Sequence, residues 1–402
     1  MKLAGPRPIK DYCLGIFDGP HATPKESHDG PVFLGIKNIT EDGRLDLSEV
    51  RHVSEEEYPR WTRRVIPQPG DVVFTYEATL HRYAIIPEGF RGCLGRRVAL
   101  VRPNPVRVDK RYLLYFFLSR SWRHMVESSV ITGATVDRIP LEKFPSFPAA
   151  LPQVDIQRRI ADILSAYDDL IENNKRRMVL LEEAARQLYR EWFVRLRFPG
   201  HEHTRITNGV PEGWARVPTP EAVEINPPTR LSDEAEHWYV EMADLPTDSM
   251  VIQSAIKRDG RSGSKFRNGD TLLARITPCL ENGKTGFVNF MAEGQAGRGS
   301  TEFIVLRSKR VTPEFVYCLA RTYQFRENAI KSMVGSSGRQ RVQESCFEKF
   351  MVPIPPRLLL NLFSEFAEPI FEQIKVLHVE NQKLRAARDL LLPRLMSGEI
   401  AV

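Results

Sequence analysis

Residues 151–198 read LPQVDIQRRIADILSAYDDLIENNKRRMVLLEEAARQLYREWFVRLRF and form the longest regularly patterned stretch of the chain. Seam positions recur there in alternating steps of three and four residues, which is the spacing of a coiled coil. These positions are Ile171, Asn174, Met178, Leu181, Ala185, Leu188 and Trp192. Because the sequence on both sides is β-like, the stretch predicts a long helix that spaces two domains rather than building one core.

A second helical stretch closes the chain at residues 355–398, PPRLLLNLFSEFAEPIFEQIKVLHVENQKLRAARDLLLPRLMSG. It carries apolar side chains at similar steps, at Ile370, Ile374, Leu377, Leu384, Leu391 and Leu395. Neither helix can bury its apolar stripe alone, so we expect the two to pair. Pro369 is expected to break the second helix, and the first helix is expected to bend near residues 165–168.

The composition predicts a protein of two or more domains, since 402 residues exceed what one core usually fills. The longest apolar run, residues 112–118, is too short to span a bilayer, so we expect a cytoplasmic protein. Five scattered cysteines without a CxxC pair indicate reduced thiols rather than disulfides or a zinc site. The net charge of +6 permits a polyanionic partner without requiring one.

Five blocks recur in the same order about two hundred residues apart, which indicates an internal repeat. They are a strand with a polar turn (31–40 and 237–246), a Gly-Asp turn with a β-branched strand (67–78 and 266–277), an amphipathic helical segment (108–128 and 312–332), a small-residue turn ending in Glu-Lys-Phe (131–144 and 335–350), and a Pro-rich exit (145–152 and 352–356). The order predicts a globular domain, a helix, a second globular domain and a second helix.

This order resembles the specificity subunit of type I restriction-modification systems, and the resemblance covers almost the whole chain. The residues that carry it are the two Gly-Asp blocks, the turns TGAT (132–135) and GSSGRQRV (335–342), the stretch IADILSAYDDLIENN (160–174) and the terminal RDLLLPRLMSGEI (388–400). The first helix has Asp155-Ile156-Gln157 where the family usually has Glu-Gln. The second copy, residues 357–363, lacks this signature.

The resemblance implies an α+β fold with two target recognition domains, each a mixed α/β globular domain. Two long antiparallel coiled-coil helices would separate them, giving a pseudo-two-fold internal repeat. The expected boundaries are 1–150 for the first target recognition domain, 151–198 for the first spacer helix region, 199–354 for the linker and the second target recognition domain, and 355–402 for the second spacer helix region.

The resemblance also implies a non-catalytic subunit that recognises a bipartite target in double-stranded DNA and directs adenine methylation and cleavage by partner subunits. Two modification (methyltransferase) subunits would dock on the helices, and restriction subunits, which are translocases and endonucleases, would join them. No cofactor is expected on this chain. S-adenosylmethionine, ATP and Mg²⁺ are expected on the partner subunits.

Two short strings are similar to motifs of nucleotide-binding and methyl-transferring enzymes, and each lacks an indispensable residue. LENGKTG (280–286) ends like a phosphate-binding P-loop, but Pro278 stands where the first glycine should be and has no amide proton. INPPT (225–229) is similar to the Asn-Pro-Pro-aromatic tetrad of amino-methyltransferases, but Thr229 replaces the aromatic that would stack on the base. Both strings are interpreted as turns.

A third string, Asp270, Glu281 and Lys284, is similar to a nuclease metal site, but its lysine follows the glutamate by three residues instead of two. His201 and His203 lack further ligands at suitable spacing. We therefore assign no metal site and no catalytic residue. Two alternatives stay open, a stand-alone nucleotide-dependent or nuclease enzyme built around Lys284 and Asp270, and an assembly protein without DNA contact.

Base edges in the major groove are read by Arg, Lys, Asn, Gln and Ser on exposed loops. The candidates in the first half are Arg63, Arg64, Arg82 with its neighbour Tyr83, Arg96, Arg97, Thr132 and Thr135. Those in the second half are Lys257, Arg258, Arg261, Lys265, Arg267, Lys284, Arg298, Ser336, Arg339 and Arg341. Most arginines in such interfaces contact phosphates rather than bases. The run KRDGRSGSKFR (257–267) is the favoured candidate, and a disordered loop is its alternative reading.

The helix seams offer a second kind of contact. We assign nine side chains either to the seam or to partner subunits, namely Ile171, Met178, Leu181, Leu188, Trp192, Ile374, Leu377, Leu384 and Leu391. The aromatic residues Tyr167, Tyr189 and Trp192 fit both roles equally.

Overall fold

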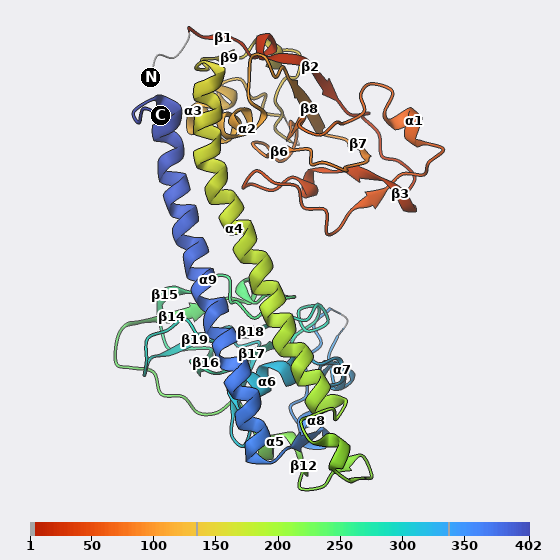
Figure 1. Ribbon diagram of the computed structural model, residues 1–402, viewed down its shortest axis with the longest axis vertical. Coiled ribbons are helices and arrows are strands. Elements are labelled where there is room, and N and C mark those ends of the chain that lie inside the picture. Colours follow the sequence, from red (N-terminus) through yellow and green to blue (C-terminus); the bar gives the residue numbers. More distant parts are fainter. Residues whose placement is uncertain (1–4, 134–135, 337) are drawn as a thin grey trace. The chain divides into compact units, whose positions relative to one another are not determined.

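The computed structural model describes residues 5–133, 136–336 and 338–402. The chain divides into two compact units, unit 1 (Met1–Ile171 with Lys383–Val402) and unit 2 (Glu172–Gln382). The long helices α4 (Val154–Tyr189) and α9 (Arg357–Ser397) contribute residues to both units (Figure 1). Thr135, one of the candidate DNA-binding residues, lies outside the described residues.

Unit 1 contains two small sheets. The first has the strand order β2 (Cys13–Asp18), β8 (Val98–Pro103), β5 (Val72–Thr75), β6 (Tyr83–Ile85), and the second has β4 (Arg51–His52), β3 (Ser27–Leu34), β7 (Gly92–Leu94). A separate pair, β1 (Arg7–Pro8) and β9 (Pro148–Ala149), and the helices α1 (Tyr58–Trp61), α2 (Lys110–Leu118) and α3 (Arg120–Glu127) complete the unit. Strand β5 is buried along its length, as its β-branched and aromatic residues favour.

Unit 2 repeats this arrangement. Its sheets have the orders β13 (Val223–Ile225), β20 (Phe303–Ser308), β17 (Thr271–Ala274), β18 (Thr285–Phe287) and β15 (Ile256–Asp259), β14 (Glu236–Val240), β19 (Ala296–Gly299), β16 (Ser264–Arg267). The remaining elements are the pairs β10 (Ile206–Thr207) with β11 (Val210–Pro211) and β12 (Ala215–Pro218) with β21 (Met351–Ile354), and the helices α5 (Thr219–Ala222), α6 (Pro313–Ala320), α7 (Tyr323–Lys331) and α8 (Cys346–Lys349). The pairs β3 with β7 and β14 with β19 are both parallel, and the second sheet of unit 2 has one further strand, β16, at its edge.

The amphipathic segment predicted to be helical in each repeat consists of two helices. In unit 1 the Ser119 hydroxyl accepts a hydrogen bond from the Trp122 amide, which starts α3 directly after α2. In unit 2 the Thr322 hydroxyl does the same for the Phe325 amide at the start of α7. The predicted helical character is confirmed, and a hydroxyl side chain that caps a new helix divides each segment in two.

Helix α9 runs without a break from Arg357 to Ser397, so the predicted break at Pro369 was wrong. A proline inside a helix removes one backbone hydrogen bond. Here the neighbouring side chains Ile370, Phe371 and Ile374 are buried in the core of unit 2. Burial of this face stabilises the helix enough to offset the missing bond.

The two long helices pack against each other within each unit. In unit 2 the seam residues Ala185, Ile374 and Leu377 are buried, while Met178, Leu181, Leu188 and Trp192 are half-buried. The buried Asn174 donates from Nδ2 to Oδ1 of Asn381 on α9 (3.1 Å). In unit 1 Ile160 and Leu164 of α4 share a core with Leu391 and Leu395 of α9. In the described part of the chain, no helix is both long and apolar enough to cross a membrane.

Candidate nucleic-acid interface

Each Gly-Asp turn places a buried aspartate beside an arginine on the adjacent strand of the sheet. In unit 1 Asp71 accepts hydrogen bonds from Nε (2.9 Å) and Nη2 (2.8 Å) of Arg102. In unit 2 Asp270 accepts from Nε (2.8 Å) and Nη2 (2.7 Å) of Arg307. The bond to Asp270 raises the pKa of Arg307. The repeated Gly-Asp motif is therefore an internal brace of the sheet.

The nuclease-like string has structural tasks in this fold. Asp270 is fully buried and also accepts from the Arg267 amide, so its oxygens face the protein. Lys284 donates from Nζ to the carbonyl oxygens of Met242 (2.7 Å) and Ala243 (3.4 Å), which fixes the short 3₁₀ turn Met242–Asp244. Among the described residues no group of three or more His, Cys, Asp or Glu side chains is placed to hold a metal ion. The enzyme alternative thus loses the two residues on which it rested.

The two small-residue turns are closed by the same backbone bridge. Ile131 and Arg138 exchange both amide hydrogen bonds (3.0 and 3.1 Å), and so do Val334 and Arg341 (3.0 and 3.0 Å). Arg341 also pairs with Glu302 (2.7 Å), and this hydrogen bond lowers the pKa of Glu302. The candidate residues Thr132, Ser336 and Arg339 are exposed on these turns.

The candidates of unit 1 divide into paired and unpaired side chains. Arg64 pairs with Asp18 (2.6 Å), Arg82 with Glu41 (3.3 Å) and Arg97 with Glu77 (2.9 Å). Arg63 and Arg96 are exposed and, among the described residues, make no side-chain hydrogen bond or ion pair. Among the candidate arginines of unit 1, Arg63 and Arg96 are therefore the most accessible to an anionic partner.

Tyr83, which was grouped with Arg82 as a DNA candidate, is wholly buried. Its hydroxyl accepts a hydrogen bond from Nε1 of Trp122 (3.1 Å), and its ring packs against Phe74 and Phe117. Residues alternate between the two faces of a strand, so neighbouring Arg82 and Tyr83 point to opposite sides. The prediction was wrong for Tyr83 because it took the pair as one surface patch.

The basic run 257–267 of unit 2 comprises the last three residues of β15, the turn 260–263 and strand β16. Every side chain of β15 is exposed, and Arg261 and Arg267 are exposed as well, while Lys265 is half-buried. Lys257 lies over the ring of Trp238 (5.9 Å to the centroid), and Arg258 pairs with Glu241 (2.9 Å). The disordered reading of this run is therefore wrong.

Arg298 was also named as a DNA contact, and the structure excludes that role. Its side chain lies on β19 and is 3% exposed. It donates from Nη1 to the carbonyl oxygen of Ser262 (3.2 Å) and from Nη2 to those of Arg258 (3.0 Å) and Asp259. Three carbonyl groups bind Nη1 and Nη2, the Nε atom is buried without a partner among the described residues, and the guanidinium therefore does not face a ligand at the surface.

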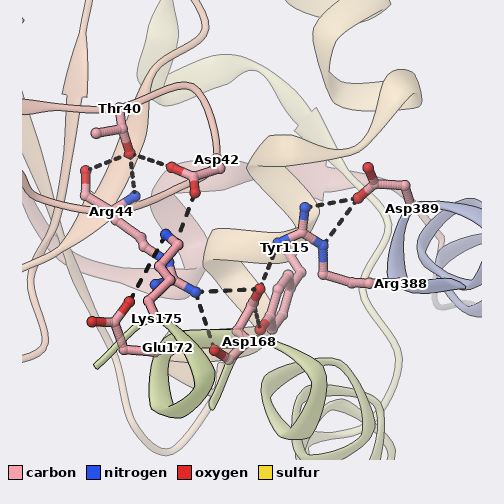
Figure 2. Close-up of polar contacts among 9 residues, drawn as sticks. All are labelled: Thr40, Asp42, Arg44, Tyr115, Asp168, Glu172, Lys175, Arg388 and Asp389. Carbon is pink, nitrogen blue, oxygen red and sulfur yellow. Dashed lines mark hydrogen bonds and ion pairs between the residues drawn. The ribbon is translucent and has the colours of Figure 1, made fainter. Parts of the chain in front are cut away.

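A polar cluster that sequence reasoning missed ties the helix pair to the domain in unit 1 (Figure 2). Asp168 of α4 accepts from Nη1 of Arg388 on α9 (2.5 Å) and from the hydroxyl of Tyr115 on α2 (2.5 Å). Arg44 donates to the backbone oxygen of Asp168 (3.1 Å). Burial raises the pKa of Tyr115, and the charge of Asp168 adds to the effect. Asp168 lies in the stretch IADILSAYDDLIENN (160–174), one of those that carry the family resemblance, and this position was the sequence signal that could have pointed to it.

Unit 2 holds α4 by a similar contact at Glu182. This buried carboxylate accepts from the hydroxyl of Tyr317 on α6 (2.6 Å) and from the amide of Met250 (2.7 Å). Burial raises the pKa of Glu182 above its ordinary value, and the two hydrogen bonds act in the opposite direction. Each unit is thus fixed to α4 by a tyrosine that donates to a carboxylate.

The family model described as the type I restriction modification DNA specificity domain matches residues 40–183. The chain is 24% identical to the MjaIX specificity subunit of Methanocaldococcus jannaschii over 98% of this chain and 89% of that subunit. It is 30% identical to the EcoEI specificity subunit of Escherichia coli over 37% of this chain and 26% of that subunit. The crystal structure of a type I restriction-modification S subunit from M. genitalium has a similar fold, with a TM-score of 0.54 and 14% identity over 98% of this chain and 96% of that one. Residues 40–183 thus match the family model of the DNA specificity domain, and over nearly its whole length the chain is similar to type I restriction-modification specificity subunits.

Proposed function

We propose that this chain is the DNA sequence-specificity subunit of a type I restriction-modification complex and that each unit reads one half of a bipartite target. The duplication carries the proposal, because both units contain a four-stranded sheet of the same order, a parallel strand pair in the second sheet, the same Asp–Arg brace and the same bridged turn. A target with two separate halves requires two such modules. Exposed basic side chains accompany them, Arg63 and Arg96 in unit 1 and Lys257, Arg261 and Arg339 in unit 2.

We infer that the helices act as an antiparallel coiled-coil spacer between target recognition domains at residues 1–150 and 199–354. In support, α4 and α9 are continuous over 36 and 41 residues. In unit 2 Asn174 meets Asn381, and Tyr189 meets Phe363 (ring centroids 6.1 Å apart), so residue numbers rise on one helix as they fall on the other. A buried asparagine pair is a known device for fixing helix register.

Catalysis is assigned to partner subunits, and the chain alone is proposed to be non-catalytic. Two methyltransferase subunits would dock on the helices, restriction subunits would join them, and S-adenosylmethionine, ATP and Mg²⁺ would bind to these partners in the cytoplasm. In support, both helices expose apolar side chains that neither unit covers, including Val179, Leu180 and Leu390. Exposed apolar surface of this kind is typical of protein interfaces.

The proposal is tested by selecting bound DNA from a randomised library. The full chain is assembled with methyltransferase subunits and incubated with duplexes that carry a random central region. The expected consensus has two short specified elements separated by an unspecified gap of fixed length. A single continuous consensus, or no enrichment by an assembled complex, would contradict the proposal.

A further inference from the structure

The segment between β15 and β16, residues 260–263, is a turn that approaches β19 closely. Gly260 and Gly263 adopt φ of +109° and +105°, a region that side chains rarely occupy. A Cβ at position 263 would lie 2.0 Å from the carbonyl oxygen of Gly299, so only glycine fits this approach to β19. The loop residues 258–262 are nevertheless exposed. An exposed loop of this kind keeps its shape only if the protein beneath holds it.

The buried Arg298 side chain holds this loop from beneath. Its guanidinium donates to the carbonyl oxygens of Arg258, Asp259 and Ser262, and thereby binds both ends of the turn. The Arg298 guanidinium carbon also lies 4.7 Å from the centroid of the Tyr239 ring, and that of Arg258 lies at the same distance. Arginine suits this position because it offers five donors in a fixed plane.

The charge of Arg298 has no carboxylate partner among the described residues, where its hydrogen bonds all go to backbone carbonyls. A buried cation without an anion is costly, and such arrangements are usually retained for a purpose other than stability. The matching strand position in unit 1 is Cys93, since Phe33 pairs with Cys93 on the parallel strands as Tyr239 pairs with Arg298. Unit 1 therefore has no arginine at the strand position from which Arg298 holds the loop in unit 2.

We propose that Arg298 is a positioning residue that fixes loop 258–262 in the conformation in which Lys257, Arg258 and Arg261 contact the half-target read by unit 2. The inference rests on the proposed function and deepens it. A loop that is ordered before binding loses less conformational freedom on the DNA, and its side chains meet base edges in one register. Without Arg298 the basic charges of the loop would still attract DNA but would discriminate poorly between bases.

The test compares complexes assembled with Arg298→Met, Arg298→Lys and Gly260→Ala. Arg298→Met removes the donors, and Arg298→Lys keeps the charge but not the planar set of donors. Gly260→Ala disturbs the loop and keeps the Arg298 side chain, since φ at this position is +109° and the added Cβ would lie 3.3 Å from Nη2 of Arg298. The control Arg216→Met removes one charge from an exposed position on β12 of the same unit. Folding is monitored by thermal melting of each complex.

Binding is measured to the selected target and to targets with one base pair changed in either half. In specific complexes a changed base pair weakens binding by roughly 5- to 150-fold. For the three variants we expect a changed base pair in the half read by unit 2 to weaken binding by less than about threefold. A changed base pair in the other half should weaken binding as much as it does for the wild type. For the control Arg216→Met, a changed base pair in either half should weaken binding as much as it does for the wild type.

Folded variants that keep the full penalty in both halves would overturn the role of Arg298 while leaving the proposed function intact. Loss of both penalties together would also overturn it, because it would indicate a general structural effect. If Arg298→Met does not fold, Gly260→Ala decides the question by the same measurement. Failure of the proposed function itself would show earlier, as a wild-type complex that selects no bipartite target.

Discussion

Replacing Asp270 by alanine should destabilise unit 2 severely, because it leaves the Arg307 guanidinium buried without its partner. The two side chains are 1% and 8% exposed, so water cannot take the place of the carboxylate. Breaking a buried ion pair by removing one partner costs about 3–5 kcal/mol. For a unit of this size that corresponds to a fall in melting temperature of roughly 6–20 °C. Calorimetry of the wild type and the variant measures it.

The repeat supplies a matched comparison. In unit 1 the partner arginine, Arg102, is 22% exposed, so water can solvate it when Asp71 is removed. Asp71→Ala should therefore cost less, about 1–3 kcal/mol. Replacing both members of the buried pair, as in Asp270→Leu with Arg307→Met, should recover much of the loss. The reasoning would be refuted if Asp270→Ala melted like the wild type yet abolished DNA modification, since Asp270 would then act at a functional centre rather than as a brace.

Three further predictions follow from the same contacts. Lys284→Ala should leave adenine methylation by the assembled complex within a few-fold of the wild-type rate, and a total loss with DNA affinity intact would contradict the structural role of Lys284. Burial raises the pKa of Glu182, so the fold favours its protonated form, and ionisation above the ordinary pKa of 4.5 costs stability. The unfolding free energy of Glu182→Gln relative to the wild type should thus rise as the pH is raised from about 4 through the range in which the buried Glu182 ionises. A difference that stays constant with pH would show that the buried charge has no such cost. Inserting four residues into each helix, after Ile171 and after Gln382, should lengthen the spacer by about 6 Å. The complex should then favour DNA targets whose two halves are separated by about one or two more base pairs. A folded, assembled variant that still selects the parental gap would show that the helices do not set the distance between the target halves.

The long helices and the internal repeat could be predicted because both rest on local patterns. The seam spacing predicted apolar positions at Ala185, Ile374 and Leu377, and all three are buried. A helix break at Pro369 was predicted because the sequence shows the local cost of a proline but not the burial of the neighbouring side chains that offsets it. Asp168 and Glu182 were missed because their partners lie on other elements, 220 residues away for Arg388 and 135 for Tyr317.

The candidate interface was only partly predictable, because exposure and pairing decide whether an arginine is available. Arg63 and Arg96 are open to solvent, whereas Arg341 is held by Glu302. Arg298 looks like these residues in the sequence but is buried beneath the loop. Its strand position is set by the pairing with β14 and β16, which depends on non-local register. Composition could identify the basic run but not the residue that shapes it.

The most direct test of the account exchanges residues 22–144 for the corresponding region of another specificity subunit and maps methylated adenines across a genome that carries the chimaeric complex. If each unit reads one half of the target, one half of the methylated sequence should change while the other half and the gap length stay the same. A chimaera that folds, assembles and methylates, but changes both halves or neither, would contradict the division of recognition between the two units.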